Sequence, residues 1–149
     1  MEVKFARSES VARTILRLLD ATSTSVDAAL YRLNNPVLAQ ALEEAARRGA
    51  HVRLLLDGNK YKESRVAQEL RARAAFPLRL SFGRHGNGSK MHHKFVVLDQ
   101  RMILTGSYNW TLESEAENYE NLVISDARAL VEAYTTEFET LWETTSDKR

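Results

Sequence analysis

Two hydrophobic periodicities alternate along the 149 residues of the chain. Short apolar runs between turn residues are typical of strands, whereas apolar residues that recur every three or four positions are typical of amphipathic helices. The runs predict strands over Val3–Ala6, Ser25–Leu33, His51–Asp57, Leu78–Phe82, Phe95–Leu98, Met102–Thr105 and Glu120–Ser125. The helical spacing predicts helices between them, including Glu63–Arg73 and Asp126–Trp142.

Residues that favour helix ends support these assignments. Ser8 or Ser10 can cap the first helix, and Asn34-Asn35-Pro36 is a typical start of the second, which is expected to end at Gly49. Asp126 is expected to cap the closing helix. The inward face of that helix would consist of Leu130, Tyr134, Phe138 and Leu141.

The order of these elements indicates the fold class. A chain that begins strand, helix, strand, helix, strand favours parallel strands joined by right-handed crossovers. Later in the chain, two strands separated by Asp99–Arg101 add an antiparallel hairpin. We therefore predict an α/β fold with a mixed, mostly parallel β-sheet sandwiched between helices, and with residues 1–149 in a single domain.

The predicted hairpin is apolar in the middle and polar at its open end. Buried polar groups without partners cost about 2–7 kcal/mol, so these residues need a structural or functional role. His92 and Lys94 are two residues apart and project from the same face of their strand. Folding the chain about Asp99–Arg101 brings Ser107 and Asn109 beside them. An imidazole, an ammonium, a hydroxyl and a carboxamide are thus expected to meet at one end of the sheet.

These groups suit chemistry on a phosphodiester. A neutral imidazole is a competent nucleophile near pH 7, so His92 is the candidate nucleophile. Lys94, Ser107 and Asn109 would bind the phosphate oxygens that gather charge in the transition state. Asp99 would lie about 23 Å from His92 along an extended strand, on the other face. We therefore expect Asp99 to secure the hairpin turn.

The spacing of these residues resembles the HKD signature of the phospholipase D superfamily. The pattern reads His92-x-Lys94-x4-Asp99-x6-Gly106-Ser107-x-Asn109, and every signature position is filled. Weaker similarity extends through SVDAALYRL, ARRGAHVRLLLD and ENYENLVI, so the resemblance covers most of the chain. Among members of the superfamily, the chain is most similar to the small bacterial nucleases that carry one signature per chain. The resemblance thus implies a phospholipase D-like domain.

The same resemblance implies a site shared by two chains in a homodimer. It also implies that Glu120 hydrogen-bonds the far nitrogen of His92 and fixes its tautomer, with Glu117 as the rival candidate. A phosphohistidine reaction needs a nucleophile on one side of the phosphorus and a proton donor on the other. Because the chain has one HxK motif, the second imidazole would be His92 of another copy. The resemblance therefore gives as catalytic candidates His92, Lys94, Asp99 and Asn109 of the signature and Glu120 after it, with Asp99 expected to act through the turn.

We expect neither a metal nor a cofactor in this site. His93 points to the face opposite His92, and adjacent strand residues do not readily converge on one ion, so His93 is expected to be structural. His51 and His85 fall at a strand start and in a loop. The lysine and asparagine of the signature, with their symmetry mates, would supply the positive field.

Charge is segregated along the chain although the net charge is only +1. Residues 47–94 contain twelve Lys and Arg against three acidic residues, and residues 113–149 contain three against ten. A solvated helix face explains such an asymmetry, and so does a basic surface for a polyanion. The second interpretation favours a metal-independent endonuclease, with DNA favoured over RNA. The alternatives are a phospholipase D-type lipid phosphodiesterase or phosphatidyl transferase, and a catalytically silent nucleic-acid-binding domain.

Composition also bears on where the protein acts. The chain has no cysteine, which fits a reducing compartment. Its first ten residues lack the apolar core of a signal peptide, and no run approaches the ~18 apolar residues of a membrane span. A cytoplasmic location without a membrane partner is therefore expected, unless the chain is an excised domain.

Overall fold

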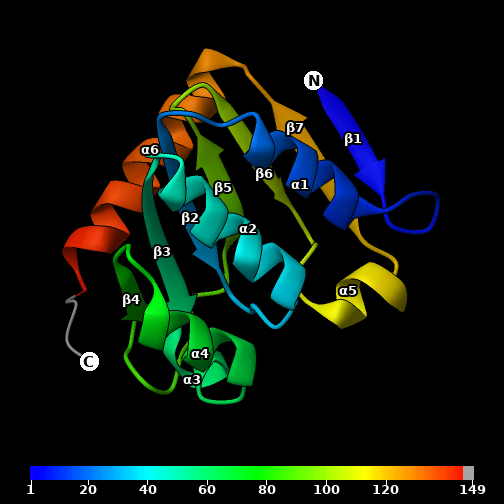
Figure 1. Ribbon diagram of the computed structural model, residues 1–149. Coiled ribbons are helices and arrows are strands. Elements are labelled where there is room, and N and C mark those ends of the chain that lie inside the picture. The colour runs from blue at the N-terminus through cyan, green and yellow to red at the C-terminus, as the bar shows by residue number, and fades with distance from the viewer. Residues whose placement is uncertain (146–149) are drawn as a thin grey trace.

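The computed structural model describes residues 1–145, which are arranged around one seven-stranded sheet (Figure 1). The strands follow the order β1-β7-β6-β5-β2-β3-β4 across the sheet. Their bounds are β1 Glu2–Phe5, β2 Ser25–Leu30, β3 His51–Asp57, β4 Leu78–Ser81, β5 Lys94–Leu98, β6 Met102–Gly106 and β7 Asn121–Ser125. Each predicted strand is found, and the largest difference is at β2, which ends at Leu30 instead of Leu33.

The helices begin where capping side chains satisfy free N–H groups. Their bounds are α1 Val11–Asp20, α2 Pro36–Arg47, α3 Gly58–Tyr61, α4 Arg65–Arg73, α5 Leu112–Ala116 and α6 Arg128–Glu143. The Ser10 side chain accepts the N–H of Arg13, and the Asn35 side chain accepts the N–H of Val37. Gly49 follows α2 with a φ of 104°, a conformation that favours glycine. These three predicted helix ends are confirmed.

Two predicted helices differ in detail from the structure. The helix expected over Glu63–Arg73 is preceded by a separate short helix, α3, and α4 starts only after Ser64. Ser64 ends the irregular segment because its hydroxyl donates to the Leu33 carbonyl at 2.6 Å and accepts the N–H of Ala67 at 3.1 Å. Asp126 does not cap α6, because Ala127 occupies the N-cap position and, within residues 1–145, no side chain accepts a hydrogen bond from the first turn of this helix. The prediction for Asp126 is therefore wrong.

The inward face of α6 is displaced from the predicted one. Leu130 is 38% exposed, whereas Val131, Phe138 and Trp142 are buried. Tyr134 and Leu141 are partly buried and pack beside them. The helix thus turns a neighbouring stripe of residues toward the sheet, with Leu130 on its flank.

The sheet is mixed, as predicted, but its balance of pairings is different. Strand β3 pairs in parallel with β2 and with β4, while the other four neighbouring pairs within residues 1–145 are antiparallel. The expectation that parallel strands dominate is therefore corrected. Helical crossovers join β2 to β3 and β3 to β4, the parallel part of the sheet, whereas β5, β6 and β7 follow one another with reversed direction.

Helices cover both faces of the sheet (Figure 1). Helices α1, α2 and α4 pack on one face, where Ala28 and Leu54 belong to the larger core cluster. Helix α6 packs on the other face, where Ala29 and Leu55 contribute to a second cluster. The central strands β2 and β3 are therefore largely buried on both faces, which explains why their sequences are mostly apolar. Two charged residues within them, Asp27 and Arg53, are paired with each other.

The β5–β6 hairpin has the predicted loop and register. Leu98 pairs with Met102, and the Arg101 N–H donates to the Leu98 carbonyl at 3.0 Å. Asp99 and Gln100 have φ values of 54° and 53°, as in the tight turns that suit the twist of a hairpin. With the register fixed at the turn, the opposite end of the hairpin is fixed as well.

Candidate active site

Several strand ends meet at the lower end of the sheet in Figure 1, where α3 and α5 lie. Strands β2, β3, β4 and β6 end there, and β5 begins there, because β5 runs antiparallel to β2 and to β6. Lys94, the first residue of β5, lies opposite Leu30, the last residue of β2. His92 and Lys94 thus reach the same end of the sheet as the segment after β6, which carries Ser107 and Asn109.

His92 and Lys94 contact each other at this end. The Nζ of Lys94 lies 3.1 Å from Nδ1 of His92 and donates to the His92 carbonyl at 3.0 Å. An ammonium group only donates hydrogen bonds, so Nδ1 accepts, and a neutral His92 ring carries its proton on Nε2. His92 is exposed, which leaves its ring accessible to a ligand.

The ring of Tyr31 supports both residues. Its centroid lies 4.3 Å from that of His92, and the Nζ atoms of Lys94 and Lys60 lie 5.4 Å and 5.9 Å from it. Tyr31 is 8% exposed, and its backbone N–H donates to the His93 carbonyl at 2.8 Å. Sequence reasoning missed this role, because an aromatic residue at the end of an apolar run is also typical of a core.

Asp57 fixes the backbone that leads to His92. Its carboxylate is almost fully buried, and Oδ1 accepts the N–H of Met91 at 2.9 Å while Oδ2 accepts the N–H of Lys60 at 3.0 Å. The residue therefore joins the end of β3, the start of α3 and the segment before β5. The sequence reasoning also missed it, although a carboxylate directly after a buried apolar run was a visible signal.

The surroundings of the pair disfavour positive charge. Desolvation, followed by the nearby charges of Lys94 and Lys90, lowers the pKa of His92, and the opposing effect of Asp57 is smaller. Desolvation also lowers the pKa of Lys94, while the charge of Glu120 acts in the opposite direction. At neutral pH the ring of His92 is therefore mainly neutral, the form that a nucleophile requires.

Glu120 and Ser107 bond to each other rather than to His92. The Ser107 hydroxyl donates to Oε1 of Glu120 at 2.6 Å and accepts a backbone N–H of β7 at 3.1 Å. The other oxygen of Glu120 accepts bonds from Ser114 at 3.0 Å and Asn118 at 3.1 Å. Within residues 1–145, Glu120 makes no hydrogen bond with His92, so the expected bond does not form in a single chain. Ser107 likewise has no free proton for a phosphate oxygen, because its bond to Glu120 uses it.

Asn109 and the rival carboxylate Glu117 lie in different surroundings. The backbone N–H of Asn109 donates to the Ser114 hydroxyl at 3.3 Å, and its side-chain Oδ1 is buried without a hydrogen-bond partner among the described residues. Glu117 is exposed at the end of α5. Asn109 therefore has an unsatisfied side-chain atom near the site, whereas Glu117 contributes no contact to His92 in the described part of the chain.

Asp99 and His93 are directed away from the His92–Lys94 pair. Asp99 lies at the opposite end of β5 and accepts the N–H groups of Thr24 at 2.7 Å and Ser25 at 3.0 Å. The Nε2 of His93 lies 2.9 Å from the Glu137 carboxylate on α6. Both residues thus join the hairpin to other elements, in agreement with the structural roles predicted from the strand offset.

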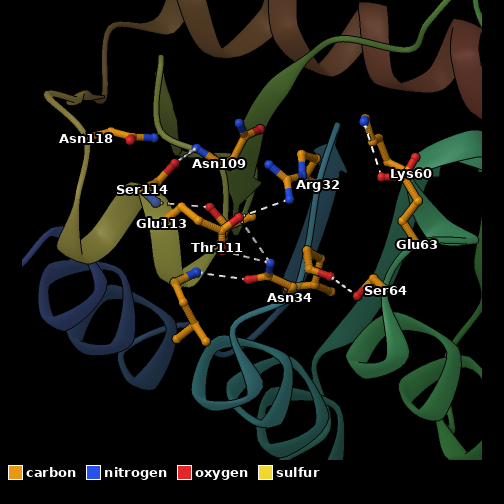
Figure 2. Close-up of polar contacts among 12 residues, drawn as sticks. Arg32, Asn34, Lys60, Glu63, Ser64, Asn109, Thr111, Glu113, Ser114 and Asn118 are labelled. Carbon is orange, nitrogen blue, oxygen red and sulfur yellow. Dashed lines mark hydrogen bonds and ion pairs between the residues drawn. The ribbon is translucent and has the colours of Figure 1, made fainter.

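A polar cluster that the sequence reasoning missed borders the pair. Figure 2 shows Arg32 and Asn34, which follow β2, directed toward Glu113 of α5. Nη2 of Arg32 donates to Glu113 at 3.0 Å, and Nδ2 of Asn34 donates to its other oxygen at 3.0 Å. Oδ1 of Asn34 accepts the N–H of Leu112 at 2.9 Å. The cluster therefore joins the segment after Tyr31 to the segment that carries Asn109.

The basic residues of the segment 47–94 divide into three groups. Arg53 is paired with Asp27 and Glu139, Arg73 with Glu43, and the guanidinium of Arg79 lies 4.1 Å from the Trp142 ring. Five more follow the ends of β3 and β4 or begin β5: Lys60, Lys62, Arg84, Lys90 and Lys94. The remaining four lie on or directly after the helices α2 and α4: Arg47, Arg48, Arg65 and Arg71. The basic surface is therefore concentrated at the site but is smaller than the charge of the segment suggests.

Comparison with known families accounts for this arrangement. The family described as "Cardiolipin synthase, PLD-like domain" matches residues 15–142, a range that includes the whole HKD signature and Glu120. The chain belongs to the phospholipase D superfamily. The resemblance noted in the sequence is thereby confirmed.

Similar proteins in this superfamily include mitochondrial cardiolipin hydrolases. The one from Xenopus tropicalis is 38% identical over 140 residues, which cover 91% of this chain and 63% of that protein. The one from Xenopus laevis is 40% identical over 136 residues, 89% of this chain and 60% of the relative. The human protein is 32% identical over 135 residues, 91% of this chain and 52% of the relative. The phospholipase D-like chain thus spans little more than half of the length of these relatives.

Solved structures confirm the fold. Nuc from Salmonella typhimurium, a phospholipase D family member, superposes with a TM-score of 0.88 at 26% identity, over 99% of this chain and 97% of Nuc. NucT from Helicobacter pylori superposes with a TM-score of 0.84 at 19% identity, over 99% of this chain and all of NucT. The second likeness concerns the fold alone. The mixed sheet flanked by helices is therefore the phospholipase D-like architecture.

Two further features of the described residues bear on ligands and location. Within residues 1–145, His, Asp and Glu side chains form no group of three or more that could hold a metal ion. In the same part of the chain, every helix is too short or too polar to cross a bilayer. The site itself contains the imidazole of His92, the cations around it and the carboxamide of Asn109.

Proposed function

We propose that this phospholipase D-like chain is a phosphodiesterase that hydrolyses nucleic acid through a phosphohistidine at His92. The observation that carries the proposal is the contact of His92 with Lys94 at 3.1 Å, on the ring of Tyr31, at an accessible end of the sheet. A neutral imidazole can attack phosphorus, and an adjacent ammonium can stabilise the oxygens that gain charge. When a phosphate binds, one of its oxygens would accept the hydrogen bond that the Lys94 ammonium donates to Nδ1 of His92. That nitrogen would then be free to attack the phosphorus.

The reaction proceeds in two displacements. A ring nitrogen of His92 forms a P–N bond while the P–O bond to the leaving group breaks. A protonated imidazole on the opposite side gives its proton to the leaving oxygen and becomes a base. That base then takes a proton from water, which attacks the phosphorus and breaks the P–N bond. Nucleophile and acid must therefore be two different imidazoles with different pKa values.

We propose that the second imidazole is His92 of another copy of the chain. The neighbouring imidazole, His93, bonds to Glu137 on the other face of the sheet and cannot serve as the acid. A two-fold axis beside the exposed end of the sheet would bring the two His92 rings to opposite sides of one phosphorus. Glu120, which bonds within its own chain, would influence the site through its charge near Lys94.

Nucleic acid is the substrate that the charge distribution favours. Four basic residues adjoin strands that end or begin at the site: Lys60, Lys62, Arg84 and Lys90. Such cations bind the phosphates of a polyanion without recognising its bases. The proposed activity requires no metal, because Lys94 and its symmetry mate supply positive charge. The cytoplasmic location expected from the sequence stays a prediction, which cell fractionation tests.

A second candidate is a lipid phosphodiesterase. The relatives at 38% and 40% identity are named cardiolipin hydrolases. In addition, Phe5 is 51% exposed and Tyr119 is 84% exposed, and both line a cavity of about 470 Å³ together with Arg7 and Glu120. Exposed aromatic side chains beside a phosphodiester site are consistent with contact to a lipid.

A hydrolysis assay separates these candidates. The purified chain would be incubated with single-stranded DNA, duplex DNA, RNA and cardiolipin vesicles, each with and without EDTA, with a His92→Asn chain as control. We expect DNA cleavage that depends on His92, persists in EDTA and decreases with added salt. Hydrolysis of cardiolipin alone would favour the second candidate, and activity that magnesium restores after chelation would contradict the proposed mechanism.

The dimer is tested separately. Light scattering at assay concentrations should give twice the mass of the chain. A fully active monomer would contradict the shared site while leaving the phosphodiesterase activity intact.

A further inference from the structure

Arg32 is a cation of the site that the reaction proposed above does not use. It follows Tyr31, whose ring contacts His92, and its side chain is 35% exposed. In the view of Figure 2 it lies between Asn109 of the segment after β6 and Lys60 of α3. Among the described residues, Arg32 makes neither a hydrogen bond nor an ion pair with His92 or Lys94. Arg32 is thus next in sequence to the residue that contacts His92, while its guanidinium bonds to Glu113 of α5.

Glu113 holds Arg32 in this position. Glu113 Oε2 accepts a bond from Nη2 of Arg32 at 3.0 Å, while Oε1 accepts one from Asn34 at 3.0 Å. The bond from Asn34 is the main cause that lowers the pKa of Glu113, against the effect of desolvation, and its own backbone N–H, the charge of Arg32 and the bond from Arg32 add to it. The carboxylate is therefore negative at neutral pH, and Asn34 fixes it independently of Arg32.

The bond to Glu113 leaves most of the guanidinium available. Arginine has five N–H donors in a planar fork that suits the oxygens of a phosphate. Among residues 1–145, the side-chain bonds of Arg32 involve Nη2 and Glu113, so Nε and Nη1 have no protein acceptor. A cation that is oriented by a carboxylate and keeps free donors can bind an anion without large rearrangement.

We propose that Arg32 binds a second phosphate of the substrate, one link from the phosphate that His92 attacks, and that Glu113 is its positioning residue. The inference rests on the proposed function, since it places the second phosphate relative to His92. The ligand chemistry is a pair of phosphodiesters joined by a short linker. Polynucleotides contain it, and so does cardiolipin, whereas a simple diester does not.

The test compares substrates with one and with two phosphates. The values of kcat/KM would be measured for bis(p-nitrophenyl) phosphate and for a short oligothymidylate, with wild-type protein and with Arg32→Gln. We expect Arg32→Gln to lose about tenfold more on the oligonucleotide than on the simple diester, as one Arg–phosphate contact is removed. The dependence of log KM on log salt should also become shallower by about one.

Arg73→Gln is the matched control. Arg73 also pairs with a carboxylate, Glu43, but it lies at the end of α4 farthest from Ser64, which contacts the Leu33 carbonyl near the site. This variant should leave the ratio of the two activities unchanged. A second arm of the experiment would use two lipids as substrates in place of the oligothymidylate and the simple diester. Cardiolipin contains two phosphodiesters, and phosphatidylglycerol contains one. A selective loss in either arm supports the subsite and identifies the source of the second phosphate.

Glu113→Gln tests the positioning role. It retains an acceptor for Asn34 but removes the charge that holds Arg32, so it should raise KM for the oligonucleotide more than it lowers kcat. Arg32→Lys should retain more activity on the oligonucleotide than Arg32→Gln does, because lysine keeps the positive charge but lacks the planar set of donors of a guanidinium. Equal losses on both substrate classes with Arg32→Gln would overturn the inference. Failure of wild-type protein to hydrolyse any diester would instead overturn the proposed function on which it rests.

Discussion

The two ends of the β5–β6 hairpin carry polar side chains for opposite reasons. At the turn, Asp99 accepts N–H groups from Ser23, Thr24 and Ser25, so its charge is matched by backbone dipoles. At the open end, His92 and Lys94 lie 3.1 Å apart, and both are basic. The N–H groups at the turn stabilise the negative charge of Asp99, whereas the open end places two basic groups beside each other.

The pKa directions express this difference. Desolvation acts to raise the pKa of Asp99, but the N–H groups of Ser25, Thr24 and Ser23 outweigh it and hold the pKa below its ordinary value. At the open end, desolvation lowers the pKa of both His92 and Lys94. The fold thus stabilises the charged form at the turn and destabilises it at the site. A bound anion would relieve that cost, which is the electrostatic pattern of a functional site.

The largest expected effect comes from the open end. His92→Asn should lower kcat by about 10³-fold or more, because it removes the nucleophile and, in a shared site, the acid of the other chain. The melting temperature should change little, since the His92 ring is exposed and contacts mainly Lys94 and Tyr31. The measurement is single-turnover hydrolysis together with thermal unfolding.

His93→Asn is the control for this prediction. His93 is adjacent in sequence but bonds to Glu137 on the other face. It should retain most of the activity. A His92→Asn chain with activity near that of wild type would show that His92 is not the nucleophile.

A smaller effect is expected in the pH dependence of the site. The charge of Lys90 is one of the causes that lower the pKa of His92. Lys90→Gln should therefore raise that pKa toward its ordinary value, about 6.5. Activity that needs the neutral ring is lost as pH falls through this pKa, so the acid limb of the kcat/KM profile should move to higher pH. Arg101→Gln makes the same charge change at the turn and should leave the limb in place, and an equal displacement in both variants would refute the assignment.

At the turn, the expected effect is on stability. Asp99→Asn should lower the free energy of unfolding at pH 7 by about 1 kcal/mol, because a charged acceptor for three N–H groups becomes neutral. A carboxyl with a lowered folded pKa contributes stability above its unfolded pKa of about 3.9, and this contribution is lost as pH falls through the folded pKa. Urea unfolding of the two proteins should therefore converge in acid. A difference that persists unchanged below pH 2 would point to a cause other than the charge.

Much of the fold could be predicted because local patterns and tertiary structure agree. Strand β3 is a continuous apolar run between Gly49 and a polar turn, and its predicted bounds match those in the structure. Helix α5 was not predicted, because LESEA is short and polar and its start is fixed by the Thr111 cap and by the bond of Leu112 to the distant Asn34. At α6, Asp126 is a good capping residue by type, but the path of the backbone places Ala127 at the N-cap position instead.

The part of the site that lies on the β5–β6 hairpin was predictable, because the register of the hairpin determines it. Counting from the three-residue turn placed His92, Lys94 and Asn109 at one end of the sheet, since a hairpin register follows from its loop. Tyr31, Asp57 and the Arg32–Glu113 pair come from distant segments, and only the strand order brings them there. Glu120 was assigned to His92 by resemblance, but neighbours close in sequence take its oxygens: Ser107, Ser114 and Asn118.

The smallest predicted effect also concerns the turn. Gln100 has a φ of 53°, which costs a residue with a side chain about 1 kcal/mol relative to glycine. Gln100→Gly removes that cost but makes the unfolded chain more flexible, which offsets about half of the gain. The free energy of unfolding should therefore rise by about 0.5 kcal/mol, with a melting temperature higher by about 1–2 °C. Gln100→Ala keeps the unfavourable conformation and should show no such increase.

Activity should be unaffected by either change, because the turn lies at the opposite end of β5 from Lys94. A loss of activity in a protein stabilised by Gln100→Gly would show that the two ends of the hairpin are coupled.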